Sequence, residues 1–199
     1  MARRVVAATV AFLLAGTAFS DSAPLQDIPL KWTPTGNLAE MGPLDISGPL
    51  LTMSIRVDTF ADSRQNPATV GENREKAANI RIVTTSTNVA SYVTEHLRDS
   101  MRGAGLNIVD GAGDVSVSGE IREFFVTETD LYRGNLSLLV SLKDKEGKEL
   151  WSGVVGGGAE HFGRSYRAKN YFETISDMVL RANYNLLANP GFHDSLKTR

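Results

Sequence analysis

The stretch that decides the fold runs from residue 115 to residue 155 and reads VSVSGEIREFFVTETDLYRGNLSLLVSLKDKEGKELWSGVV. Apolar and polar residues alternate over 115–126, 136–142 and 150–155. This period of two is typical of strands that bury one face, and the short connections predict that the three strands are antiparallel. The alternation in the first strand changes phase part-way, which predicts a β-bulge near Glu123.

Outside this stretch the sequence predicts two helices and further strands. Residues 51–57 alternate in the same way, and 80–83 is a short apolar run. Apolar residues recur about every fourth position over 89–101 and 171–187, the spacing of amphipathic helices. We therefore expect an α+β fold, in which an antiparallel sheet of about four strands is covered on one face by two amphipathic helices.

The N-terminal end has the organisation of an exported protein. Residues 1–20 combine a basic head, an uncharged apolar stretch too short to span a membrane, and small residues before Asp21, which together predict a signal peptide. Residues 21–49 contain five of the seven prolines and are expected to form an extended arm that lies on the domain. Residues 50–199 are expected to form a single α+β domain.

Composition limits the chemistry that this chain can perform. There is no cysteine, which excludes disulfides, thiol nucleophiles and zinc–thiolate sites. The 21 basic and 23 acidic residues give a net charge of −2, so no overall field attracts nucleic acid. Removal of residues 1–20 takes away Arg3 and Arg4, and the remaining 19 basic and 23 acidic residues make the exported form mildly acidic.

No motif in the sequence predicts catalysis or a cofactor. Residues 158–165 have the spacing of a phosphate-binding loop, but Arg164 stands where that loop requires lysine. His96 and Asp99 lie three apart on a predicted helix and could supply two metal ligands, but a solvent-exposed helix face is the favoured interpretation. His161 has no further ligand at metal spacing. We expect a protein that is not an enzyme and that needs no metal or other cofactor.

The loop from residue 62 to residue 76 is the segment whose polarity exceeds what a connection needs. Its guanidinium groups could hold an anionic group of a partner through paired hydrogen bonds. Alternatively, they could pin the loop internally to neighbouring carboxylates, and the sequence does not decide between the two. The candidate partner-binding residues are Asp62, Arg64, Asn66, Glu72 and Arg74.

The sequence resembles the YajG-type family of bacterial envelope lipoproteins over roughly residues 50–196. The matching features are the strand ending at Asp58 followed by the Asp62-Ser63-Arg64 segment, and the residues 70–74, VGENR. The helix that ends in residues 102–106 and the terminal helix ending near Asn189 continue the likeness. The resemblance implies a non-enzymatic protein of the periplasm or cell envelope. This chain departs from the family in one respect, because Ala18-Phe19-Ser20-Asp21 stands where the family has its lipidated cysteine. We therefore expect a form that is not held at the membrane by a lipid.

Three functions follow as hypotheses. The first is a non-catalytic accessory protein of the periplasm or cell envelope that binds an envelope protein or a lipid-linked partner, with no nucleic acid partner and no transmembrane helix once the signal peptide is removed. The second is a carrier that holds an apolar or lipid ligand between sheet and helices, in an interior lined by Leu138 and Val140. A hydrolase is a third and less favoured hypothesis, because it needs a convergent acid–base pair.

Overall fold

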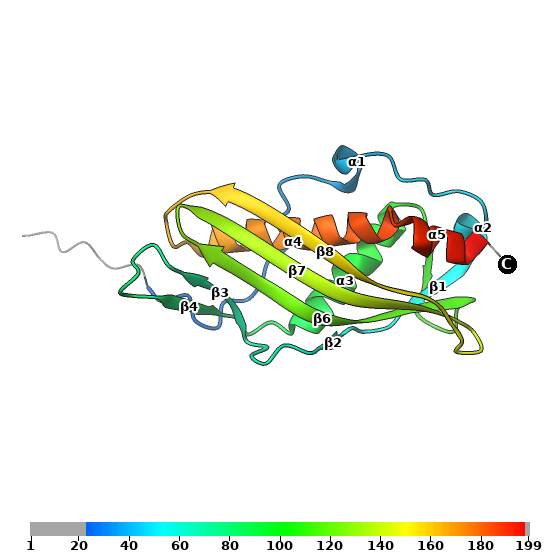
Figure 1. Ribbon diagram of the computed structural model, residues 1–199, viewed down its shortest axis with the longest axis horizontal. Coiled ribbons are helices and arrows are strands. Elements are labelled where there is room, and N and C mark those ends of the chain that lie inside the picture. The colour runs from blue at the N-terminus through cyan, green and yellow to red at the C-terminus, as the bar shows by residue number, and fades with distance from the viewer. Residues whose placement is uncertain (1–22, 198–199) are drawn as a thin grey trace, which may run out of the picture.

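Three long strands form the centre of the sheet in the computed structural model, which describes residues 23–197. They are β6 (Val115–Glu128), β7 (Leu131–Asp144) and β8 (Glu149–Phe162), and they pair antiparallel in chain order (Figure 1). The pairing of β6 with β7 shifts register between Ile121 and Glu123, so Arg122 is the extra residue of a bulge. The predicted three-stranded unit and its bulge are therefore confirmed.

The other edge of β6 carries short strands that pair with it in parallel. They are β1 (Ser54–Val57), β2 (Ala61–Asp62) and β3 (Thr69–Asn73), which follow one another along its length. Outside them, β5 (Asn107–Val109) pairs with β1, and β4 (Arg81–Thr84) pairs with β3.

The expected antiparallel sheet of about four strands is thus wrong in number and in direction, since the described sheet has eight strands and is mixed. The predicted strand 51–57 is also corrected at its start. Its first residues belong to the short helix α2 (Pro49–Thr52), where Pro49 at the first helical position favours a helical turn. The expected short strand at 80–83 corresponds to β4. Strands β2, β3 and β5 escaped the sequence analysis, because two to five residues show no readable period.

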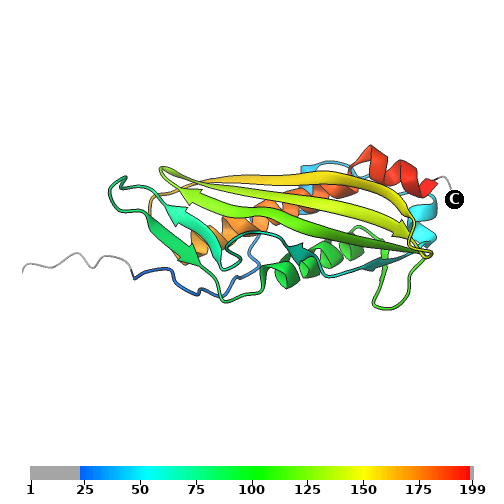
Figure 2. The same cartoon turned by 60° about the horizontal axis from the view of Figure 1, so that its bottom comes forward.

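Two helices cover one face of this sheet, as predicted (Figures 1 and 2). Helix α3 (Val89–Gly103) begins at Asn88, whose side chain accepts a hydrogen bond from the Ser91 N–H. Helix α4 (Ala168–Leu187) runs beside β8 so closely that a Cβ on Gly157 would lie 1.9 Å from the carbonyl oxygen of Met178. Glycine at this position therefore allows helix and strand to pack backbone to backbone.

The space between sheet and helices is filled by apolar side chains. Leu138 and Val140 of β7 are 1% and 0% exposed, and the helices contribute residues such as Leu97 and Ile175, both fully buried. Neither Leu138 nor Val140 lines any of five main hollows at the surface of residues 23–197. A close-packed interior of this kind does not favour the carrier hypothesis.

Residues 23–49 form an N-terminal arm that lies along the rest of the chain. Ile28 forms a parallel bridge with Thr85, and the Thr33 N–H donates to Ser176 Oγ on α4 at 2.9 Å. The arm contains the short helix α1 (Leu38–Met41), and α5 (Pro190–Lys197) follows α4 after a single turn. The predicted signal peptide, residues 1–20, lies outside the described residues. Among those residues, no helix combines the length and apolarity needed to cross a membrane.

Candidate functional site

The bulge in β6 leaves a gap on the edge that carries the short strands. Strand β2 pairs with Glu120 and Ile121, whereas β3 begins its pairing at Val126. The backbone between these points has no strand partner on this edge among the described residues. Because buried carbonyl groups require donors, the loop at 63–68, which crosses the gap, has to supply them.

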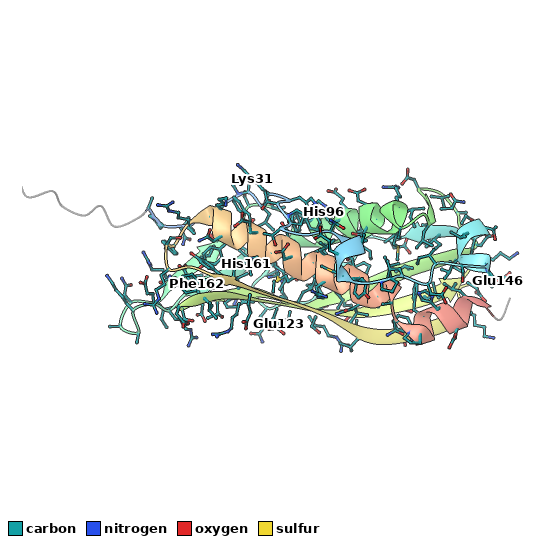
Figure 3. All side chains as sticks on the ribbon, turned by 90° about the horizontal axis from the view of Figure 1, so that it is seen from above. Lys31, His96, Glu123, Glu146, His161 and Phe162 are labelled. Atoms are coloured by element: carbon teal, nitrogen blue, oxygen red, sulfur yellow. The ribbon has the colours of Figure 1, made fainter. Side chains whose placement is uncertain are left out.

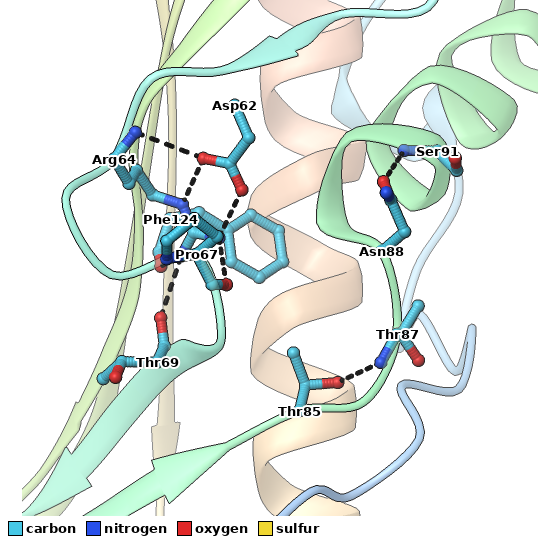
Figure 4. A network of polar contacts seen from close by, with 9 residues as sticks. All are labelled: Asp62, Arg64, Pro67, Thr69, Thr85, Thr87, Asn88, Ser91 and Phe124. Carbon is cyan, nitrogen blue, oxygen red and sulfur yellow. Dashed lines mark hydrogen bonds and ion pairs between the residues drawn. The ribbon is translucent and has the colours of Figure 1, made fainter.

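The side chain of Arg64 fills this gap (Figure 4). Its Nε and Nη2 bind the two carboxylate oxygens of Asp62 at 2.8 and 2.7 Å, and Nη2 also donates to Pro67 O at 2.6 Å. Its Nη1 donates to Thr69 O at 2.8 Å and to Phe124 O at 3.1 Å. A guanidinium has five N–H donors, and each has an acceptor here.

Arg64 and Asp62 therefore act within the fold. Their side chains are only 8% and 14% exposed, and the guanidinium also lies 5.3 Å from the centre of the Phe124 ring. Of the two interpretations left open by the sequence, the internal one describes this pair. The Asp62-x-Arg64 pattern holds the loop in place of a strand.

The other predicted site residues lie apart from this pair. Glu72 is on β3, and Arg74, which is 54% exposed, binds its carboxylate through Nε at 2.5 Å just after the strand ends. Asn66 is exposed at the tip of the loop, where its backbone oxygen accepts a hydrogen bond from Thr69 N. The structure thus does not bring the five predicted residues into one cluster.

A hollow of about 370 Å³ lies between the loop and the bulge, and we call it the bulge hollow. Of its lining residues, the predicted site included only Arg64 and Asn66. Arg122, Glu123 and Phe125 were missed, although the change of phase near Glu123 marked their position. Arg122 and Glu123 are exposed and make no ion pair with any other described residue. The full lining is Arg64, Gln65, Asn66, Thr69, Arg122, Glu123, Phe124 and Phe125.

The cluster of His161, Asp177 and Thr35 differs from a nucleophilic triad in the order of its groups. His161 Nε2 lies 2.8 Å from Asp177 Oδ2, and the Thr35 hydroxyl donates to the same oxygen at 2.6 Å. In a nucleophilic triad the histidine stands between hydroxyl and carboxylate, whereas here the carboxylate stands between the other two groups. This arrangement ties the arm to α4 and to the end of β8. Residues 158–162, part of the phosphate-loop spacing, belong to β8 itself and cannot form such a loop.

A buried carboxylate that the sequence analysis did not identify lies at the end of the sheet. Glu128 is 0% exposed and accepts hydrogen bonds from the Tyr132 and Tyr171 hydroxyls at 2.6 and 3.0 Å and from Tyr166 N at 2.8 Å. Burial, followed by the nearby Glu128 charge, raises the pKa of Tyr171 above its ordinary value. Burial and the hydrogen bond to Glu128 also raise the pKa of Tyr132. The Tyr132 and Tyr171 hydroxyls thus keep their protons and donate hydrogen bonds to the buried carboxylate, so the cluster ties β6, β7 and α4 together.

His96 occupies a different environment, at the contact between arm and helices. Its ring stacks on that of Trp32 with 3.9 Å between ring centres, and burial lowers its pKa, while Asp99 and Glu95 oppose that shift. No group of three or more histidine or acidic side chains that could hold a metal ion occurs within residues 23–197.

Comparisons with known proteins identify the fold. No family model and no curated protein matches the sequence. Among solved structures, the chain is similar to protein XCC0632 from Xanthomonas campestris, assigned to family DUF330, with a TM-score of 0.53 and 10% identity over 82% of this chain and 90% of that one. It is less similar to CT253 from Chlamydia trachomatis (TM-score 0.49, 12% identity, 73% and 98% covered). Lipoprotein GNA1162 from Neisseria meningitidis is more distant (TM-score 0.35, 13% identity, 57% and 87% covered). The chain therefore shares its fold with XCC0632, whereas its likeness to the YajG-type family rests on sequence features alone.

Proposed function

We propose that this chain is a non-catalytic accessory protein of the bacterial periplasm or cell envelope and that it binds an envelope protein through the bulge hollow. One observation supports the proposal above the others, namely the group of unengaged polar side chains around this hollow. Arg122 and Glu123 have no ion-pair partner among the described residues, and Asn66 is exposed beside them. Arginine and aromatic side chains are enriched at protein interfaces, and Phe125 supplies the aromatic surface.

The loop beside the hollow is well suited to recognition because it is held rigidly. The five hydrogen bonds of Arg64 keep the loop in one position, so little conformational entropy is lost when a partner binds. The predicted signal peptide supports an exported protein.

In-cell photocrosslinking tests this binding site. A benzoylphenylalanine at position 66 is expected to give a crosslinked partner in the envelope fraction, which mass spectrometry identifies. Arg122→Glu should reduce the adduct at least tenfold, because it reverses a charge on the rim of the hollow. Arg74→Glu, outside the hollow, should leave the adduct unchanged. A full adduct from folded Arg122→Glu protein, or an equal adduct from a probe at Lys145 on the distant hairpin turn, would contradict the proposal.

Export is tested separately by the intact mass of the protein recovered from the periplasmic fraction. We expect the mature chain to begin at Asp21 or within a few residues of it. A periplasmic form that retains Arg3 and Arg4 would show that the signal peptide was wrongly assigned, and it would leave the binding site untouched.

A further inference from the structure

The outer edge of β8 is a long strand edge without a strand partner. Strand β8 pairs with β7 only, so its other edge has no strand beside it among residues 23–197. The Asn185 side chain of α4 donates to Gly156 O at 2.7 Å. A hydrogen-bond donor from outside the sheet can therefore reach a backbone carbonyl of this strand. The run from Gly156 to Gly158 has no side chains that would keep another backbone away. An unpaired edge of this kind is a template for a further strand.

A hollow of about 350 Å³ lies beside this edge, between β8, α4 and α1, and we call it the edge hollow. Most of its charged groups are already engaged. Asp177 binds His161 and Thr35, Glu160 binds Arg133, and Glu40 accepts a hydrogen bond from the Asn37 backbone. Its lining is Thr35, Gly36, Asn37, Glu40, Met41, Gly158, Ala159, Glu160, His161, Asp177 and Arg181.

Arg181 differs from the other charged groups of the edge hollow. It is exposed on α4 and makes no ion pair with any described residue. An acidic side chain that enters the hollow could therefore form an ion pair with Arg181.

Two apolar side chains of β8 flank the glycine run on the face of the sheet that the helices do not cover. Val154 is 61% exposed and Phe162 is 87% exposed, which are the highest values among the large apolar residues found exposed. Figure 3 looks onto this edge and shows Phe162 and His161 at its end. Side chains alternate between the two faces of a strand. One set of side chains of an added strand would therefore lie near Val154 and Phe162, and the other set would lie near the edge hollow.

We propose that the outer edge of β8 binds an extended segment of a partner protein, which adds a strand along residues 154–162 and places an acidic side chain in the edge hollow against Arg181. Its alternate side chains pack on Val154 and Phe162. This surface is separate from the bulge hollow, so either site can bind without the other.

A second copy of this chain does not fit the same edge. Because α4 lies directly against Gly157, two copies paired about the glycine run would bring their α4 helices about as close as neighbouring strands, ~4.8 Å apart. Packed helices require about 8–10 Å between axes. A single extended segment carries no helix and avoids this clash.

A displayed library of random nonapeptides, selected on the full mature protein, tests the proposal. We expect enriched peptides with alternating apolar residues and an acidic residue on the other face. In fluorescence polarisation, Arg181→Glu should weaken their binding at least tenfold, whereas Arg122→Glu at the bulge hollow should change it less than twofold. Circular dichroism melts should show both variants folded.

Backbone methylation separates strand addition from other modes of binding. In an antiparallel or parallel pair only alternate N–H groups of the added strand point to its neighbour. Single N-methylation of an enriched peptide should abolish binding at alternate positions and spare it at those between. A library without enrichment, binding that survives Arg181→Glu, or equal tolerance of N-methylation at every position would each overturn the proposal. Any of these results with an intact crosslink from position 66 would leave the proposed function standing.

Discussion

Replacement of Arg64 by alanine is expected to destabilise the whole domain, although Arg64 lies in a polar loop. The substitution leaves the Asp62 carboxylate, which is 14% exposed, without its cation. It also removes the donors to the carbonyl oxygens of Pro67, Thr69 and Phe124. Removing one partner of a buried ion pair costs about 3–5 kcal/mol, and we expect roughly 3 kcal/mol because this pair retains some contact with water.

The measurement is urea unfolding followed by circular dichroism, supported by thermal melts. For a domain of this size 1 kcal/mol corresponds to roughly 2–4 °C in Tm, so Arg64→Ala should lower Tm by roughly 6–12 °C. Arg64→Lys keeps the charge but loses the planar fork, and it should fall between the wild type and Arg64→Ala.

Arg74→Ala is the matched control, because it removes the same type of side chain from an exposed ion pair. Arg74 is 54% exposed, and a pair of this kind contributes less than about 1 kcal/mol. If Arg64→Ala and Arg74→Ala lowered the free energy of unfolding by the same small amount, the internal role of Arg64 would be refuted.

Three further predictions concern the core, the helix contact and the pH dependence. Gly157→Ala should lower the free energy of unfolding in urea by more than about 2 kcal/mol, because its Cβ would lie 1.9 Å from a backbone oxygen of α4. In the control Gly156→Ala the nearest atom to the new Cβ is 3.6 Å away, so stability should hardly change. Equal losses in the two variants would contradict this packing. Leu138→Asp should lower the free energy of unfolding by about 3–5 kcal/mol, because it buries an unpaired carboxylate. Ser137→Asp, on the other face of β7, should lower it much less. Comparable melting temperatures for the two variants would show that Leu138 does not face the core. Burial holds the pKa of His96 below its ordinary value. As the pH falls through about 6.5, the unfolded chain therefore binds a proton at this residue before the folded chain does. The free energy of unfolding should consequently decrease from pH 7 to pH 5. His96→Gln should lose less stability over the same interval, and an unchanged pH dependence would rule out this role.

The long strands and both main helices could be predicted from the sequence because each has many periods of its pattern. The bulge was also predictable, since the phase of β6 changes at Glu123. The parallel pairing of β1, β2 and β3 with β6 was not, because strands such as Ala61–Asp62 are too short to show a period. Their placement depends on β6, whose residues lie roughly sixty positions further along the chain.

The candidate site was predictable only as a region. The charges of residues 62–76 identified a loop more polar than a connection requires. The orientation of the Arg64 side chain was not predictable, because one of its acceptors, Phe124 O, lies sixty residues away in the chain. Arg122 and Glu123 could not be identified as unengaged, because that requires knowing which residues surround them. Local patterns thus indicated where polar groups concentrate, and tertiary contacts decided which of them remain available.

The position of the N-terminal arm has a consequence for the order in which the chain acquires its structure. Thr33 and Thr35 bind Ser176 and Asp177, which follow them by 143 and 142 residues. The arm is synthesised before α4, so Thr33 and Thr35 cannot make these bonds until Ser176 and Asp177 have left the ribosome. The preceding residues of the arm have nearer partners, since Ile28 bridges Thr85, and they can dock much earlier. Docking of the arm can therefore occur in two steps, the second of which requires a completed α4.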